Sequence, residues 1–241
     1  PDSILSDELG LELACAWSDE LGTTELWYRL LNIGRPVIAM AGTDMFVDFH
    51  RTPAIGTARV YAQQTQETVQ WAPYIKAVKE GRSFVTNTPI LLLELGGKAT
   101  PGDVIEVGKQ NFSLFVTSAV AVENIELIIN GEVAWTGGSI KAGISKTFNG
   151  EIELPKGGWI AARAHGGNSS WPLMDSYPFA HTSPIWINHK GSTDDIAKAN
   201  ATREIRRALR QIEERARLTY KDDDISVLLE RLELARAAIT N

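Results

Sequence analysis

One carboxylate is the best candidate for chemistry in this chain. Asp44 follows an apolar run, residues 37–41, that is bounded by Pro36 and by Gly42-Thr43. Short apolar runs between such breakers are typical of strands buried on both faces of a parallel sheet. Residues just past the C-terminal ends of these strands line the active sites of α/β barrels and open α/β sheets. Asp44 is therefore a candidate for catalytic or metal chemistry, and the alternative is a cap of the following turn or helix.

The residues before this strand predict a helix that completes an α/β unit. Residues 23–32 begin with threonines suited to capping, place leucines at helical spacing and end before Gly34. About one such unit is expected before the β-rich region. One or two units can neither close a parallel sheet nor cover both its faces, so the sequence predicts a missing partner segment.

Five short motifs follow one another between about residues 11 and 188. They are Trp27-Tyr28-Arg29-Leu30-Leu31-Asn32 with Gly34, Ala41-Gly42-Thr43-Asp44, Gly56 with Arg59 and Tyr61, Gly81-Arg82-Ser83-Phe84-Val85-Thr86-Asn87 with Pro89, and Ala180-His181-Thr182-Ser183-Pro184. In this order they resemble the C-terminal part of a metallohydrolase of the polymerase-and-histidinol-phosphatase (PHP) superfamily, in its CehA/McbA-like branch. Each motif alone is weakly specific, and the combination carries the resemblance.

The resemblance implies an α+β multidomain chain. Residues 1–88 would be the last αβ units of a PHP-type (β/α) barrel and residues 89–190 an immunoglobulin-like β-sandwich. Residues 191–241 lie beyond the resemblance, and their sequence pattern predicts a C-terminal helical hairpin. In this superfamily divalent metals lie at the C-terminal ends of the barrel strands, and a His-x-His pair on the first strand supplies ligands. This chain lacks that pair, so most ligands would come from an upstream segment of the same protein.

The implied activity is hydrolysis of an ester, phosphoester or amide in a small-molecule substrate by metal-activated water. Asp44 matches the late-barrel metal ligand, and the metal would be zinc, manganese or iron. Many relatives carry Asp-x-His here, whereas this chain has Asp44-Met45-Phe46, which removes one ligand. His50 and Arg59 are expected to contact the substrate, and a surface-loop histidine is the alternative for His50. A catalytic metal typically takes three protein ligands, so activity would need the upstream segment.

Residues 90–187 change to short β-rich segments separated by turn residues, which predicts the sandwich. Asn130-Gly131 gives the strongest hairpin signal. A different class of function is a non-catalytic module that binds carbohydrate or protein. Its aromatic residues could form a sugar platform, but strand periodicity favours Trp159 and Trp186 as core residues. The loop at residues 166–171, ending in Trp171, is the better binding candidate, and His181 is expected to support the structure.

The C-terminal residues predict two helices. Ile205, Leu209, Ile212 and Ala216 form a narrow apolar stripe on the first helix. An acidic run at residues 222–224 is placed to cap the second. The two stripes can cover each other, and the remainder would pack on the body or on a second copy of the chain. The interleaved arginines and glutamates of residues 203–214 indicate an ion-paired helix face more than a phosphate-binding stripe.

Composition limits the remaining classes of protein. The net charge of −6 argues against nucleic acid as the main partner. No apolar run approaches the length of a membrane span, so a soluble chain without a membrane partner is expected, at an unspecified cellular location. A single cysteine, Cys15, excludes an intrachain disulfide and is expected to be a small buried hydrophobic residue.

Overall fold

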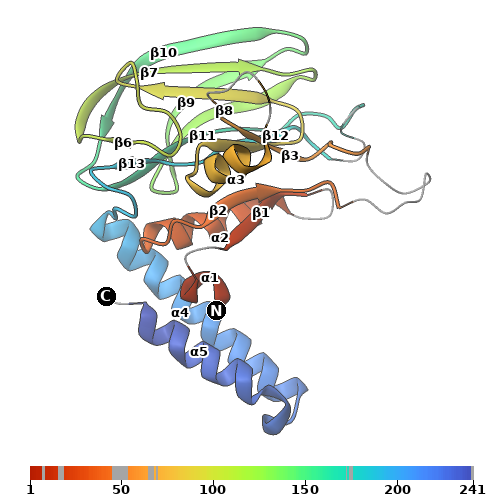
Figure 1. Ribbon diagram of the computed structural model, residues 1–241, viewed down its shortest axis with the longest axis vertical. Coiled ribbons are helices and arrows are strands. Elements are labelled where there is room, and N and C mark those ends of the chain that lie inside the picture. Colours follow the sequence, from red (N-terminus) through yellow and green to blue (C-terminus); the bar gives the residue numbers. More distant parts are fainter. Residues whose placement is uncertain are drawn as a thin grey trace.

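The computed structural model describes residues 1–6, 9–15, 19–44, 54–64, 68, 70–171, 173 and 176–239. The structure is α+β, and its parts are stacked along the long axis (Figure 1). A pair of β-sheets lies at one end, a small β–α–β unit lies beneath it, and two long helices, α4 (Asp195–Thr219) and α5 (Ser226–Ala238), project at the other end.

The β–α–β unit contains the predicted helix and strand together with a strand that was not predicted. β1 (Gly10–Ala14) and β2 (Ile38–Ala41) pair in parallel, and α2 (Glu20–Asn32) connects them. The helix begins before the predicted residue 23 because Asp19 caps it, accepting a hydrogen bond from the Gly22 amide at 3.0 Å. A single turn of helix, α1 (Asp2–Leu5), precedes the unit.

Two sheets form a sandwich above this unit (Figure 1). The smaller sheet has the order β10 (Ser145–Leu154), β7 (Gly108–Thr117) and β5 (Ile90–Leu95). The larger sheet runs through β3 (Arg59–Ala62), β4 (Ser83–Thr86), β12 (Phe179–Thr182), β11 (Gly158–His165), β13 (Ile185–Ile187) and β6 (Val104–Ile105), and from β11 it continues to β8 (Val122–Ile129) and β9 (Glu132–Ile140).

The larger sheet has an apolar core on each of its faces. One core fills the space between the two sheets and includes Leu114, Ile125 and Ile160. The other core lies between the larger sheet and the β–α–β unit, and includes Trp27 of α2 and Phe179 of β12. Because both faces are covered, short strands such as β4 and β12 are buried along their whole length.

The hairpin predicted at Asn130-Gly131 is confirmed. The two residues connect β8 to β9 and have φ angles of 53° and 94°. Two successive positive φ angles are typical of the tight turn that matches the twist of paired strands. α3 (Trp71–Lys79) begins two residues before Pro73, because proline is tolerated only in the first turn of a helix.

The pairing of β4 crosses the predicted boundary at residue 88. Thr86 of β4 pairs with Ala180 of β12, and β3 pairs with β4 on the other side. In the described part of the chain, these two strands extend the sandwich and do not join β1 and β2. Among the described residues 1–88, two parallel strands joined by a helix occur in the β1–α2–β2 unit.

The C-terminal helices form a hairpin whose first helix packs on α2 and whose second packs on α1. Asp194 caps α4 by accepting hydrogen bonds from the Ile196 and Ala197 amides, each at 3.0 Å. Ile205 and Leu209 of the predicted stripe are buried, whereas Ile212 is exposed. None of the helices in the described residues is both long enough and apolar enough to cross a membrane.

Candidate functional site

The C-terminal ends of β1 and β2 bring together two chemically capable side chains. Ala14 is paired with Ala41 at the ends of the parallel strands. Cys15 and Asp44 follow, and the Cys15 thiol points to Asp44 Oδ2 with a sulfur–oxygen distance of 3.9 Å. The cysteine is buried and the aspartate is exposed. Asp44 therefore lies at the strand end that the sequence predicted, with its carboxylate open to solvent.

The backbone around Asp44 has an unusual conformation and leaves room for a neighbouring side chain. Asp44 has a φ of 47°, a left-handed conformation that aspartate tolerates better than most residues. A Cβ atom on Gly42 would lie 2.5 Å from Glu12 Oε1, so glycine leaves room for this second carboxylate. Glu12 lies on the exposed outer face of β1. Two carboxylates thus border the open end of the β1–β2 pair.

Thr43 links this strand end to the segment that leads into β3. Its hydroxyl accepts a hydrogen bond from the Gly56 amide at 3.0 Å and donates one to the Ala58 carbonyl at 3.2 Å. Thr43 precedes Asp44 and Ala58 precedes Arg59, so the two predicted site residues Asp44 and Arg59 lie on segments that are joined by these hydrogen bonds. His50, the third predicted site residue, lies outside the described residues.

Arg59 is held by the backbone around it. Its Nη1 donates to the carbonyls of Gly56 and Thr57 at 2.7 and 3.0 Å, and to the Asn87 carbonyl at 3.4 Å. Its Nε donates to the Tyr61 hydroxyl at 3.1 Å. Arg59 therefore ties the loop before β3 to the end of β4. Its predicted contact with substrate stays a prediction.

A chain of hydrogen bonds continues from Asn87 to the start of α2. The Asn87 side-chain amide donates to the Tyr177 carbonyl at 2.7 Å, and its oxygen accepts from the Phe179 amide at 2.8 Å. Ser176 then donates to Glu20 Oε1 at 3.2 Å. Glu20 is the first residue of α2 and is buried. The motif residues Arg59 and Asn87 thus connect to a buried carboxyl that the sequence did not single out.

Burial governs the ionisation of this carboxyl and of its neighbour. Burial raises the pKa of Glu20, while hydrogen bonds from Tyr177 and Ser176 oppose that shift. Burial also raises the pKa of the Tyr177 hydroxyl, and the nearby negative charge of Glu20 raises it further. Glutamate at a helix start is common as a dipole partner, so nothing in the sequence pattern marked Glu20 as different.

The described residues contain no cluster of three or more His, Cys, Asp or Glu side chains with the geometry of a metal site. Asp44 fits the role of one ligand, because its carboxylate is exposed at the strand ends and oriented by Cys15. A catalytic zinc site typically needs three protein ligands. This part of the chain therefore offers a partial coordination sphere.

A second polar cluster lies between α2 and the larger sheet. His181 is completely buried. Its Nδ1 lies 2.7 Å from the Thr182 carbonyl and must donate there, so Nε2 accepts from the Tyr28 hydroxyl at 2.6 Å. Trp159 donates to Asn32 at 2.8 Å in the same layer. The supporting role predicted for His181 agrees with this geometry.

Two of the tryptophans considered for a sugar platform belong to the core. Trp159 and Trp186 are buried, as strand periodicity favoured. Trp171 is 74% exposed at the end of the glycine-rich loop. Of these tryptophans, only Trp171 presents its ring to a ligand in solution.

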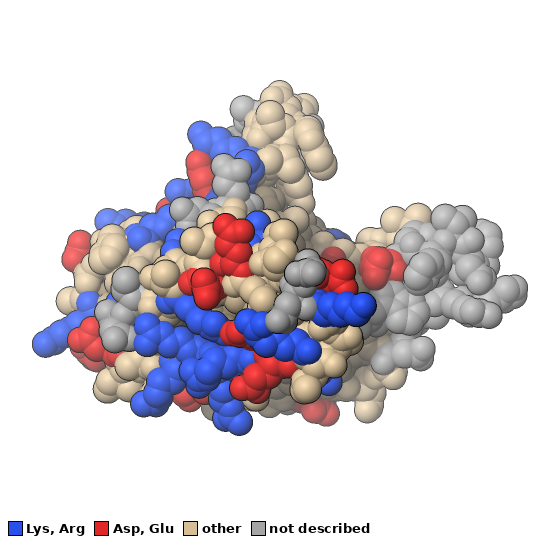
Figure 2. Space-filling model, turned by 90° about the horizontal axis from the view of Figure 1, so that it is seen from below, with Lys and Arg blue, Asp and Glu red and all other residues tan. Residues whose placement is uncertain are grey.

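Basic side chains gather over the helical tail, on the face seen in Figure 2. Several of them are ion-paired: Glu213 binds Arg217 at 3.0 Å and also binds Arg236, and Glu204 binds Arg29 of α2. The arginine partners lie outside residues 203–214, so ion pairing among the predicted arginines and glutamates of that segment stays a prediction. Such exposed pairs contribute little to stability individually.

Neither the models of known protein families nor the curated proteins include a match to this chain.

Proposed function

We propose that this chain is the C-terminal portion of a PHP-type metal-dependent hydrolase of the CehA/McbA-like branch, with an immunoglobulin-like sandwich. One observation carries the proposal: β1 and β2 form a two-stranded parallel sheet with Cys15 and Asp44 at its C-terminal ends. Active sites of α/β barrels lie at these ends.

The exposure of the β1–β2 sheet supports a missing partner. Parallel strands are normally covered on both faces, yet Met40 on the outer face of β2 is 36% exposed and Glu12 beside it is exposed. In the described residues, no strand pairs with the outer edges of this sheet. An upstream segment of the same protein would cover that face and add the remaining barrel strands.

The residues of this chain have distinct roles in the proposal. Asp44 would hold one divalent metal, zinc, manganese or iron, and Cys15 would orient the carboxylate through its thiol. The bound metal supplies an activated water and an electrophilic centre for hydrolysis of an ester, phosphoester or amide. Arg59 and His50 would contact the small-molecule substrate near the strand ends.

Replacing Asp44 with asparagine tests the proposal in the protein produced together with its upstream sequence. Asn keeps the size of the side chain but removes the anionic ligand, so metal content and turnover should both fall at least about tenfold. Elemental analysis measures the metal content per chain. Turnover is measured with ester, phosphoester and amide substrates. The matched change Asp195→Asn, in the exposed first turn of α4, should leave both unchanged. Unaltered metal content in Asp44→Asn would overturn the assignment.

The exposed Trp171 supports a second candidate function, a carbohydrate-binding module. The C–H face of a sugar ring is apolar, and an exposed indole offers a stacking surface for it. Screening the full chain against a glycan array tests this candidate. Binding that is lost in Trp171→Ala and kept in Trp71→Ala, which removes the equally exposed Trp71 of α3, would support it. Binding that survives Trp171→Ala would exclude this site.

A further inference from the structure

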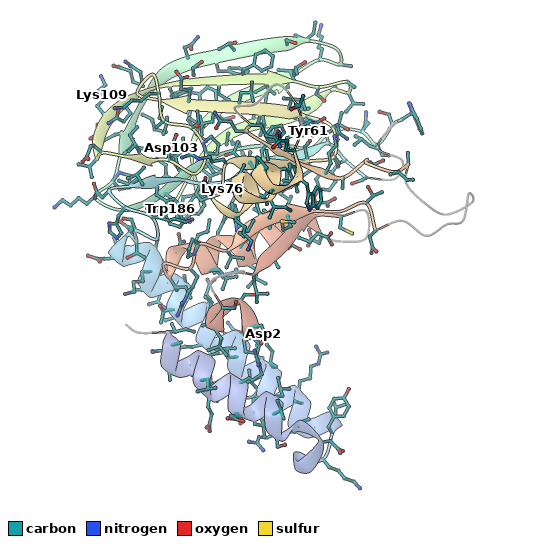
Figure 3. The ribbon with its side chains drawn as sticks, in the orientation of Figure 1. Asp2, Tyr61, Lys76, Asp103, Lys109 and Trp186 are labelled. Carbon is teal, nitrogen blue, oxygen red and sulfur yellow. The ribbon has the colours of Figure 1, made fainter. Side chains whose placement is uncertain are left out.

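A groove runs along one edge of the sandwich, where the two sheets diverge. It has a volume of about 540 Å³ and is lined by residues 90–94 of β5, by Tyr61 and Phe84 of β3 and β4, and by Phe115 of β7. Tyr61, labelled in Figure 3, stacks on Phe84 with ring centroids 5.0 Å apart and is 41% exposed. The size and the largely apolar lining are typical of a binding site.

Strand β5 borders the groove with its backbone edge. β5 is the last strand in the order of the smaller sheet, so its side away from β7 is an edge. The groove extends from there over the outward face of the sheet, where Leu92 of β5 lies opposite Phe115 of β7. β5 pairs with β7 on its other side, and beyond the groove Leu95 pairs with Ala99. Among the described residues, no strand pairs with residues 90–94 on the groove side.

The two edges of the smaller sheet are protected differently. β10, at the far edge, carries the charged residues Lys146, Glu151 and Glu153, which discourage pairing with another strand. β5 reads Ile-Leu-Leu-Leu-Glu-Leu, with Glu94 as its one charge. An apolar, unpaired edge of this kind is a template for strand addition.

We propose that the groove binds one extended polypeptide strand of a partner protein. This strand would pair with β5 as the fourth strand of the smaller sheet and place an apolar side chain against Tyr61 and Phe84. Main-chain hydrogen bonds to β5 would supply affinity, and the aromatic pair would select the side chain. The proposal does not depend on hydrolase activity, because it rests on the sandwich alone.

The shape of the groove favours a lone strand over the edge of a second sandwich. Residues 61–63 and 82–84 form the wall opposite β5. A second copy that paired through its own β5 would bring the same wall with it, and the two walls would compete for the space beside the shared edge. A single strand needs room only for its own backbone and alternate side chains.

A peptide with alternating threonine and valine residues and one central phenylalanine is a suitable probe. The full chain is titrated with this capped, fluorescently labelled peptide, and binding is followed by anisotropy. Two further versions of the peptide carry N-methyl groups on alternate amides. One version is methylated at the odd-numbered amides and the other at the even-numbered amides. One methylated set removes the donors that face β5, so it should bind at least about tenfold more weakly. Equal binding by all three peptides would overturn strand addition.

Two further readouts locate the bound strand. Tyr61→Ala should weaken binding of the unmethylated peptide about tenfold, while Tyr220→Ala, in the exposed segment after α4, should leave it unchanged. Amide hydrogen exchange of residues 90–94 should slow when the peptide binds. Absence of binding at millimolar peptide would overturn the proposal. So would protection of residues 90–94 without peptide in a dimer detected by sedimentation, because a second copy would then occupy the edge.

Discussion

His181 is a neutral histidine enclosed by aromatic rings. Its ring lies 5.2 Å from the Trp27 ring in an edge-on arrangement and accepts a hydrogen bond from Tyr28. Burial, the largest cause, together with the nearby Arg163 and His165 lowers the pKa of His181 to about 3. The Thr182 carbonyl, which favours the protonated ring, opposes this shift only in part.

This histidine should make the protein less stable in mild acid. In the unfolded chain a histidine titrates near pH 6.5, so between this pH and about 3 the unfolded state binds one proton more than the folded state. The free energy of unfolding should therefore fall as the pH falls through this window, by about 1.4 kcal/mol per pH unit from this residue. Stability at pH 7 and above is unaffected by this linkage.

The variant His181→Gln isolates the effect, because its amide can replace both hydrogen bonds but binds no proton. Urea unfolding of both proteins at several pH values between 5 and 7 provides the measurement. The variant is expected to be less stable at pH 7 and to lose less stability on acidification. Parallel pH dependences in the two proteins would show that His181 is not the proton-linked group.

For single residues, the sequence predicted the place in the fold better than the side chains that each residue contacts. Asp44 was predicted from the strand end that precedes it, and the structure places it there. The contact of Asp44 with Cys15, 29 positions away, depends on β1, which the sequence pattern did not indicate. Glu20 and Tyr177 meet only because the segment before β12 folds back over the start of α2.

Among the elements, α2 is joined to the larger sheet by the side chain of Asn32 as well as by the hydrogen bond from Tyr28 to His181. Asn32, at its last turn, accepts from Trp159 Nε1 at 2.8 Å and donates to the Asn130 carbonyl at 3.0 Å. Asn32→Leu would leave the buried indole N–H of Trp159 without its partner. Such an unsatisfied group costs about 1–3 kcal/mol, and chemical denaturation would measure the loss. Asn149→Leu, on the exposed face of β10, should change stability by less than about 0.5 kcal/mol.

The helical tail should be held by apolar packing more than by its ion pairs. Leu232 of α5 is completely buried, whereas Leu218 near the end of α4 is 88% exposed. Truncation of a buried leucine leaves a cavity, so Leu232→Ala should cost about 2–5 kcal/mol. Leu218→Ala should be nearly neutral in the same thermal unfolding experiment. Equal destabilisation by the two variants would mean that the tail packs differently in solution.

Elements that show a clear pattern of apolar residues with flanking turn residues were predicted, whereas β12, which shows no such pattern, was missed. β5 and β13 lie at the two ends of the predicted β-rich region, residues 90–187, where each is a short apolar run. β12 is only four residues long and is buried on both faces, so it shows no alternation of polar and apolar residues. Its pairing with β4 is a long-range contact, and such contacts are set by packing and not by local sequence.

At the scale of the whole molecule, the larger sheet joins residues that the sequence assigned to different domains. β3 and β4 continue the sheet from β12, and the β–α–β unit covers the face that carries Trp159 and Phe179. A cut at residue 88 would therefore remove two strands and expose one of the two apolar cores. Folding of the sandwich should depend on residues 1–88.

A comparison of two fragments tests this dependence. Residues 1–190 keep the β4–β12 pairing and the helix over Trp159, and lose the part of the second core that α4 and α5 supply. Residues 89–190 lose the pairing and the helix as well. We expect the longer fragment to melt cooperatively by circular dichroism, with buried tryptophan fluorescence. The shorter fragment should show no cooperative transition and should bind a dye that reports exposed apolar surface. Cooperative melting of residues 89–190 would instead show that the sandwich folds alone, with a domain boundary at residue 88.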